Sequence, residues 1–376
     1  MKVKRRIRLT KVGKLVFGLL ILILVLLCIP TVVRKVEYNS LVNKGYSDTT
    51  SSYVIKHKLY KKVKALEYNK ALDKVIETNN YKEEYYDKYL DIIYYESDNF
   101  SESVNKFLEK GYSPSDINLI SNHGTPSDVD EFSNHDYVDN ISKILAKDYA
   151  KVRLIDRYIA YQYENFCAWG DANYAVGLNF DLEPFTELST YTTYDPLMIV
   201  NKYHSVTSDY DPGELTTLSL DYSRDGDAKL VPVVAEAFIK MADAAKQDGL
   251  IIKARSAYRS YQDQQNLWDS YSKSYSKERL YALVAKPGFS EHQTGLALDI
   301  MSSNGQATFI TTKEYAWMKE NCYKYGFIHR YPDGKSNITG YDIESWHYRY
   351  VGVDAATRIH DEGITFEEYY MLYVEK

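Results

Sequence analysis

The hydrophobic pattern of the chain begins with one uninterrupted apolar run. Residues 15–33 contain 19 consecutive uncharged residues, enough to span a bilayer as a helix. Seven Lys or Arg residues and no acidic residue precede the run, which predicts an N-terminus inside the cell and the remainder outside. A cleaved signal peptide is the alternative, but the run is long for such a peptide and no A-x-A cleavage motif follows it. We therefore expect residues 1–35 to form a basic cytoplasmic tail and an uncleaved transmembrane anchor.

The next region, residues 36–165, has the hydrophobic spacing of amphipathic helices and is rich in Lys, Asn and Tyr. It contains a degenerate repeat, because LVNKGYS at 41–47 recurs as FLEKGYS at 107–113. A histidine, His57 or His123, follows each copy ten residues later. Two helical units of about 65 residues would each bury a face against the other, which predicts an all-α repeat domain. Since the histidines occupy matching positions, we interpret them as packing or capping residues rather than metal ligands.

The pattern changes again after residue 165. Residues 166–194 lose the helical period and gain Gly, Asn, Thr and Pro, which predicts a linker. From residue 195 to residue 376, helical and strand periods mix without regular alternation, which indicates an α+β domain. The expected helices are 230–247, one that begins at about residue 262, 311–325 and two after residue 353. The expected strands are 250–254, 296–301, 327–330 and 346–351.

Charge and cysteine content narrow the possible functions. The first 35 residues hold nine of the 46 basic residues and no acidic one, so the remainder has 37 basic and 52 acidic residues, a net charge of −15. This balance argues against electrostatic binding of nucleic acid. Cys28 lies in the apolar run, and the sequence leaves open whether Cys167 and Cys322 form a disulfide or remain two thiols.

The clearest chemistry lies in PGFSEHQTGLALDIM at residues 287–301. His292 and Asp299 are too far apart to be neighbours on one helical turn, but a loop that curls into a strand can bring their side chains together. The small residues Gly295 and Ala297 allow the backbone to pass close to whatever the two side chains hold. A metal ion is the obvious candidate, and it needs a third ligand from elsewhere.

The sequence ESWH at residues 344–347 offers that ligand and a base. A hydrolytic zinc site needs three protein ligands, an open position for water and a group that takes the proton of this water. His347 completes the ligand set. Glu344, three residues earlier, can lie beside the reacting water without being a ligand, and Trp346 would wall the site.

Three segments together resemble the D-alanyl-D-alanine carboxypeptidase family, the zinc peptidases of the vancomycin-resistance carboxypeptidase type. They are SAYRSYQDQ at 256–264, the pattern S-x-H-x-x-G-x-A-x-D at 290–299, and ESWHYRYVG at 344–352. The resemblance covers residues 195–353 and implies an α+β zinc peptidase domain with a small antiparallel sheet and flanking helices.

The resemblance also implies the roles of the central residues. His292, Asp299 and His347 would bind one Zn²⁺, and Glu344 would act as general base and then as general acid. Ser345 departs from the pattern, because a proline is usual there in this family. Serine removes no ligand but makes the backbone between Glu344 and His347 less rigid.

Three further residues are expected to act on the substrate by the same resemblance. Arg259 would stabilise the developing oxyanion, while Ser290 and Gln264 would help to hold the substrate. A guanidinium beside a zinc ion suits the negative charge of a tetrahedral intermediate.

We therefore expect a membrane-anchored enzyme that removes the terminal D-Ala from peptidoglycan stem pentapeptides outside the cell. One alternative is an endopeptidase of the same fold that cleaves between L-Ala and D-Glu. Another is a non-catalytic wall-binding module, against which the intact set of ligands and base argues. The sequence leaves open a preference among terminal D-Ala, D-Ser and D-lactate, and the oligomeric state.

Overall fold

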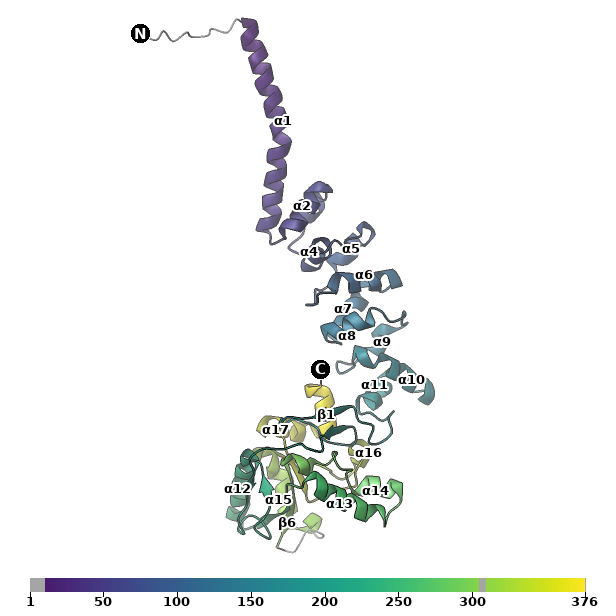
Figure 1. Ribbon diagram of the computed structural model, residues 1–376, viewed down its shortest axis with the longest axis vertical. Coiled ribbons are helices and arrows are strands. Elements are labelled where there is room, and N and C mark those ends of the chain that lie inside the picture. Colours follow the sequence, from purple (N-terminus) through teal and green to yellow (C-terminus); the bar gives the residue numbers. More distant parts are fainter. Residues whose placement is uncertain (1–10, 304–308, 376) are drawn as a thin grey trace, which may run out of the picture. The chain divides into compact units, whose positions relative to one another are not determined.

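The computed structural model describes residues 11–303 and 309–375. The chain divides into two compact units, residues 1–146 with 151–153 and residues 147–150 with 154–376. In its described part the first unit is entirely helical, whereas all described strands belong to the second unit (Figure 1).

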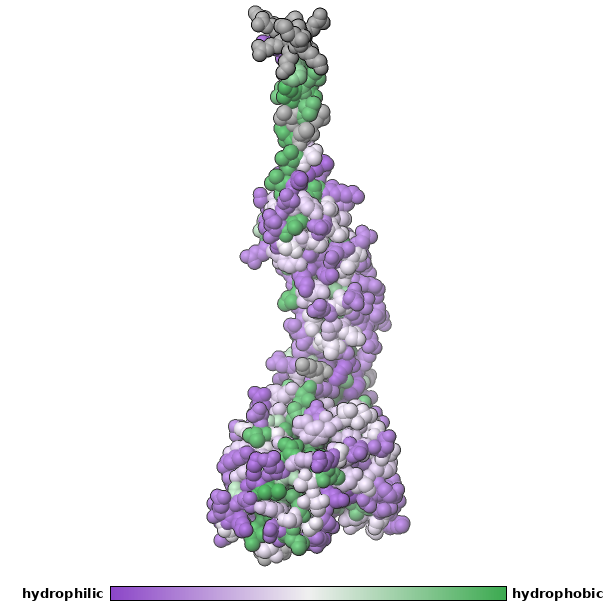
Figure 2. Space-filling model, turned by 60° about the vertical axis from the view of Figure 1, so that its left-hand side comes forward, coloured by the Kyte–Doolittle hydropathy of each residue, from purple (hydrophilic) through white to green (hydrophobic). Residues whose placement is uncertain are grey.

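The first unit begins with the long helix α1 (Lys11–Asn43), purple in Figure 1. Its apolar segment has a mean hydropathy of 3.1 and is not buried by the rest of the chain. Figure 2 shows hydrophobic side chains along this helix. Within the described residues, α1 is the one helix that is long and apolar enough to cross a membrane, in agreement with the predicted anchor.

Short helices make up the rest of the first unit, and they bury residues such as Val54, Leu72 and Val104 completely. They are α2 (Asp48–Lys56), α3 (Tyr60–Lys64), α4 (Lys70–Glu77), α5 (Tyr86–Leu90), α6 (Phe100–Lys110), α7 (Pro114–Asn122), α8 (Pro126–Phe132) and α9 (Ile141–Ile144).

The two copies of the K-G-Y-S sequence adopt the same local structure. Gly45 and Gly111 both have positive φ, +107° and +100°, within two residues of the ends of α1 and α6. Ser47 and Ser113 then cap the N-termini of α2 and α7 with their side chains. Each copy therefore turns the chain from one helix into the next, although the division into two repeat units stays a prediction.

The two histidines of the repeat also occupy equivalent places. His57 is the C-terminal cap of α2 and stacks on Tyr53, with ring centroids 4.0 Å apart. His123 is the C-terminal cap of α7. These positions agree with the interpretation of both as packing or capping residues.

The second unit combines helices with short strands. Its elements are α10 (Ile155–Asn165), α11 (Trp169–Gly177), β1 (Ser189–Tyr191), β2 (His204–Val206), β3 (Thr216–Thr217), β4 (Lys229–Leu230), α12 (Pro232–Gln247), β5 (Ile252–Ser256), α13 (Tyr261–Ser272), α14 (Lys277–Leu283), β6 (Ala297–Ser302), α15 (Lys313–Asn321), β7 (Phe327–His329), α16 (Ser336–Thr339), β8 (His347–Tyr350), α17 (Val353–Glu362) and α18 (Phe366–Tyr369).

The stretch 166–194 differs from the linker that its composition predicts, because it contains α11 and β1. Strand β1 pairs in parallel with β2. Arg157 on α10 binds Asp181 through two hydrogen bonds of 2.7 and 2.6 Å. β2 and Arg157 both lie outside residues 166–194, so the composition of this stretch does not reveal these contacts.

A four-stranded antiparallel sheet, in the order β5-β6-β8-β7, carries the site. Leu298 and Ile300 of β6 are fully buried in the hydrophobic core, together with Phe238 of α12. Because side chains alternate along a strand, Asp299 points to the opposite face of the sheet. It pairs with His347 of β8, so the sheet register brings these two side chains together.

The predicted α+β architecture with a small antiparallel sheet is present. Each of the four predicted strands coincides with one strand of this sheet to within two residues at each end. Strands β2 to β4 and helices α14 and α16 have no counterpart in the prediction. Cys167 and Cys322 are both free thiols, which answers the question that the sequence left open.

The buried His204 on β2 predicts a pH-dependent stability. Burial lowers the pKa of His204 from 6.5 to about 4, and its Nδ1 lies 2.8 Å from Ser189 Oγ. As the pH falls from about 6.5 to about 4, the unfolded state takes up this proton first, so stability is lost over that window. The loss approaches about 3 kcal/mol for this residue.

Urea denaturation of the wild type and of His204→Gln at pH 7 and pH 4.5 measures this effect. The variant is expected to show a smaller fall in the free energy of unfolding between the two pH values. Equal falls in both proteins would refute the assignment to His204.

Candidate metal centre and active site

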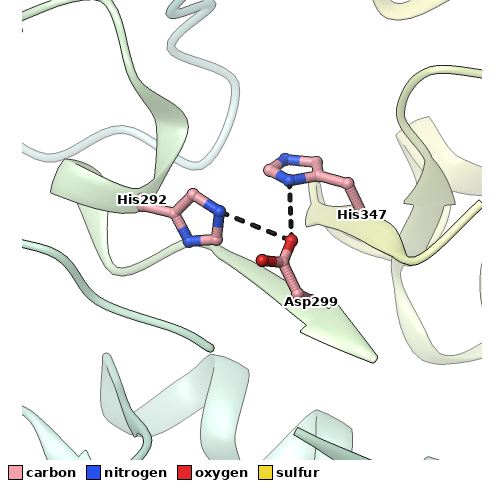
Figure 3. Close-up of side chains that lie close together, drawn as sticks. All are labelled: His292, Asp299 and His347. Atoms are coloured by element: carbon pink, nitrogen blue, oxygen red, sulfur yellow. Dashed lines mark hydrogen bonds and ion pairs between the residues drawn. The ribbon is translucent and has the colours of Figure 1, made fainter. Parts of the chain in front are cut away.

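The three predicted ligands, His292, Asp299 and His347, meet in the structure (Figure 3). Their possible ligand atoms all lie within 4.8 Å of one another. Asp299 Oδ1 is 3.5 Å from His292 Nε2 and 3.2 Å from His347 Nδ1. Two imidazoles and one carboxylate around a common point form the donor set of a hydrolytic zinc site.

His292 is held by a short helical turn that leads directly into β6. This turn, η3 (Glu291–Thr294), ends at Gly295 with φ of +68°, where a Cβ atom would approach Val231 Cγ1 to 3.1 Å. Nδ1 of His292 lies 2.7 Å from the carbonyl oxygen of Ala257. Since a carbonyl only accepts, Nδ1 carries the hydrogen, and Nε2 is left to bind a metal.

A buried carboxylate orients His347 so that Nδ1, not Nε2, is the nitrogen available to a metal. Its Nε2 lies 3.1 Å from Glu291 Oε2, which leaves Nδ1 on the side of Asp299. Burial lowers the pKa of His347, but the hydrogen bonds to Asp299 and Glu291 outweigh this effect and raise it to about 9. The two carboxylates thus favour a positive charge at this point, as a bound metal ion would supply.

Glu291 is a site residue that the sequence analysis missed. Its side chain is fully buried and also accepts hydrogen bonds from Arg330 Nε at 2.8 Å and Arg349 Nη1 at 3.1 Å. Burial alone would raise the pKa of Glu291, but the two guanidinium groups outweigh it and hold this pKa far below its usual value. Its position directly before His292 in the motif was the available signal, but its partners lie 39 to 58 residues further on.

Glu344 lies beside the triad, with Oε2 3.8 Å from His347 Nδ1, and burial raises its pKa to about 7. Its backbone N–H donates to Tyr331 O at 3.2 Å, and its carbonyl accepts from His329 Nε2 at 3.1 Å. These bonds hold the backbone on both sides of Glu344.

A cavity of about 770 Å³ lies over the triad. All seven predicted site residues line it: Arg259, Gln264, Ser290, His292, Asp299, Glu344 and His347.

Arg259 is fixed in this cavity by its neighbours. Its Nη1 donates to Gln264 Oε1 at 2.8 Å and its Nη2 to Ser256 Oγ at 3.3 Å. Gln264 in turn donates from Nε2 to the carbonyl oxygen of Ala285 at 2.6 Å. The amide of Gln264 therefore orients the guanidinium.

Tyr341 is a second cavity residue that the sequence analysis missed. Its hydroxyl is buried and has no hydrogen-bond partner within the described part of the chain. A buried hydroxyl without a partner is costly, so it is a candidate donor to a bound molecule. Its residue type and spacing carried no signal in the sequence.

An α+β domain with a His-Asp-His group and an adjacent glutamate defines a metallohydrolase centre of the zinc type. Residues 227–353 match the family model described as D-alanyl-D-alanine carboxypeptidase, VanY. The chain is 31% identical over 182 residues to the bifunctional D-Ala-D-Ala dipeptidase and carboxypeptidase VanXYC of Enterococcus gallinarum, covering 46% of this chain and 93% of the relative. The chain therefore belongs to the D-alanyl-D-alanine carboxypeptidase family, whose members are metallopeptidases, as its motifs predicted.

Two further proteins are similar to this chain. The chain is 41% identical over 181 residues to the putative carboxypeptidase YodJ of Bacillus subtilis, covering 46% of this chain and 66% of the relative, just under two thirds. A solved vancomycin-resistance D,D-pentapeptidase VanY in complex with Zn(II) is 36% identical, with a TM-score of 0.40, covering 46% of this chain and 98% of that one. The donor set of two histidines and one aspartate fits the predicted cofactor, one Zn²⁺.

Proposed function

We propose that this protein is a membrane-anchored zinc D,D-carboxypeptidase that removes the terminal D-Ala from peptidoglycan stem pentapeptides. The observation that carries the proposal is the position of Glu344 beside the His-Asp-His group, in a cavity that also contains Arg259. An acid–base group, a metal-ligand set and a fixed guanidinium are the parts that amide hydrolysis by activated water requires.

The residues of the chain divide the reaction between them. Zinc held by His292, Asp299 and His347 would supply Lewis-acid chemistry and lower the pKa of water. Glu344 accepts a proton from the water that attacks the peptide carbonyl carbon, and it then returns this proton to the leaving amine of D-alanine. Arg259 stabilises the oxyanion that forms when the carbonyl bond opens.

The free carboxylate of the terminal residue needs hydrogen-bond donors. We assign this role to the hydroxyl groups of Ser290 and Tyr341, which both line the cavity. Gln264 contributes to substrate binding by holding Arg259 in place.

The proposed location follows from α1 and its flanking charges. The basic residues before the apolar run favour a cytoplasmic N-terminus, so the peptidase domain lies outside the membrane. Peptidoglycan stem peptides are on that side, so anchor and activity support each other.

The test uses the full chain in detergent micelles, a stem pentapeptide ending in D-Ala-D-Ala, and mass spectrometry of the products. We expect the loss of one D-Ala, which a zinc chelator abolishes and added Zn²⁺ restores. A stem tetrapeptide ending in a single D-Ala shows whether the enzyme also accepts an L-residue before the cleaved bond.

Other outcomes would replace the proposal. Cleavage between L-Ala and D-Glu would make the protein an endopeptidase. A zinc-loaded protein that binds peptidoglycan but cleaves none of these peptides would be a wall-binding module.

A further inference from the structure

The cavity over the metal ligands has a second basic wall that the proposed reaction does not use. Arg224 and Arg255 line the same cavity as His292, Asp299 and His347. Neither arginine belongs to the motifs that identify the family. A cavity of about 770 Å³ is also near the upper end of ordinary small-molecule sites, roughly 300–1,000 Å³, so it has room for substrate residues that precede the two terminal alanines.

A β-bulge places Arg255 at this wall. Ala254 pairs with Ile300 and Ser256 pairs with Asp299, so Arg255 is an extra residue of β5 without a partner on β6. Bulges beside active sites bend the strand and redirect a side chain. Arg255 is therefore the bulged residue, and the next residue, Ser256, pairs with the proposed metal ligand Asp299. Arg255 is exposed and lines the cavity.

The segment of Arg224 is fastened to the same point of β5. The N–H of Arg224 donates to Ala254 O at 2.9 Å, and the N–H of Ala254 donates to Tyr222 O at 2.8 Å. The Arg224 guanidinium pairs with Asp225, which compensates its charge. Arg255, in contrast, has no hydrogen bond or ion pair from its side chain to any of the described residues.

The contacts therefore show no structural role for the charge of Arg255. The other charged groups at the cavity, Arg259, Glu291, Asp299 and Glu344, all contact other site residues. An uncompensated guanidinium that lines a cavity is suited to bind a carboxylate through two parallel hydrogen bonds.

We infer that Arg255 binds a second carboxylate of the substrate, separate from the carboxylate at the C-terminus of the peptide. This inference rests on the proposed function, because it concerns which stem peptides the same site accepts. Stem peptides carry such a group in two places, as the free α-carboxylate of γ-linked D-glutamate and as the side-chain carboxylate of diaminopimelate. The site therefore selects acidic stems over amidated or neutral ones.

The experiment measures peptide binding by calorimetry to the full chain in detergent, with Glu344→Gln to prevent cleavage. Three pentapeptides are compared: one with D-glutamate and diaminopimelate, one with the D-glutamyl carboxylate amidated, and one with lysine in place of diaminopimelate. Arg255→Gln is expected to weaken binding of the first peptide about tenfold. It is expected to leave unchanged the binding of whichever peptide lacks the carboxylate that Arg255 contacts, which identifies the source of that carboxylate.

Lys253→Gln is the matched control, since Lys253 carries the same charge on the same strand but does not line this cavity. The inference would be overturned if Arg255→Gln bound each of the three peptides as tightly as its parent protein does. It would also be overturned if the substitution weakened the binding of all three peptides by the same factor. The absence of peptide binding would overturn it as well. If the protein with Glu344 intact cleaves none of the peptides, the proposed function fails separately, while the binding comparison still decides the role of Arg255.

Discussion

Replacing Glu344 with glutamine is expected to lower kcat on the D-Ala-D-Ala pentapeptide about a thousandfold, in the range that general acid–base groups contribute. Glutamine keeps the size of the side chain but cannot accept the proton of the attacking water. Zinc is expected to stay bound, because Glu344 is not one of the three residues that form the donor set. Steady-state kinetics together with zinc content by mass spectrometry measure both effects.

Glu320→Gln serves as the matched control for this variant, because Glu320 is exposed on α15 and does not line the cavity. It is expected to retain the activity of the wild type. A zinc-loaded Glu344→Gln protein within tenfold of the wild-type rate would exclude Glu344 as the general base. Loss of zinc from this variant would instead make Glu344 part of the metal site.

The three candidate ligands could be found in the sequence because their signals are local. Asp299 stands between Leu298 and Ile300, and the alternation of a strand turns it away from the core that its neighbours enter. His292 and His347 each belong to a short motif with few possible arrangements. What joined the three residues was the pairing of β6 with β8, which places Asp299 opposite His347.

The carboxylate that orients His347 was not predictable in the same way. Arg330 and Arg349 read as ordinary charged residues at the end of one predicted strand and within another, and charged residues are usually exposed. Both are fully buried, because Glu291 and Glu367 neutralise them across the domain. Such a network depends on contacts between distant segments, which hydrophobic periodicity does not report.

The prediction of a linker at residues 166–194 failed for a related reason. Tyr174 of α11 hydrogen-bonds Glu368 at 2.7 Å, across 194 residues of sequence. β1 depends on β2 for its pairing. These elements are stabilised by the peptidase domain and carry only weak local signals.

Substitution of Glu291 is expected to have two separable effects, one on stability and one on zinc binding. Glu291→Ala leaves Arg330 and Arg349 without their shared carboxylate in a fully buried position. Removing one partner of a buried ion pair typically costs about 3–5 kcal/mol of folding free energy. Urea denaturation of the metal-free protein measures this loss without the contribution of bound zinc.

Glu291→Gln tests the effect on the metal, because glutamine preserves the shape of the side chain but removes its charge. The amide is a weaker acceptor for Nε2 of His347, so the imidazole loses both orientation and basicity. Zinc affinity is expected to fall about 10- to 100-fold, as for other residues that hold a metal-ligating histidine. Competition with a chromophoric chelator measures this affinity without any assay of activity.

Glu367→Gln separates the two effects. Within the described residues, Glu367 binds the same Arg330 at 2.6 and 2.9 Å but forms no hydrogen bond or ion pair with His347. It disturbs the same buried charge network from its other end. We expect it to lower stability while leaving zinc affinity close to that of the wild type. If Glu367→Gln weakened zinc binding as much as Glu291→Gln, the network would act on the metal site only through general stability. Retention of full zinc affinity by Glu291→Gln would likewise show that His347 needs no carboxylate to hold its orientation.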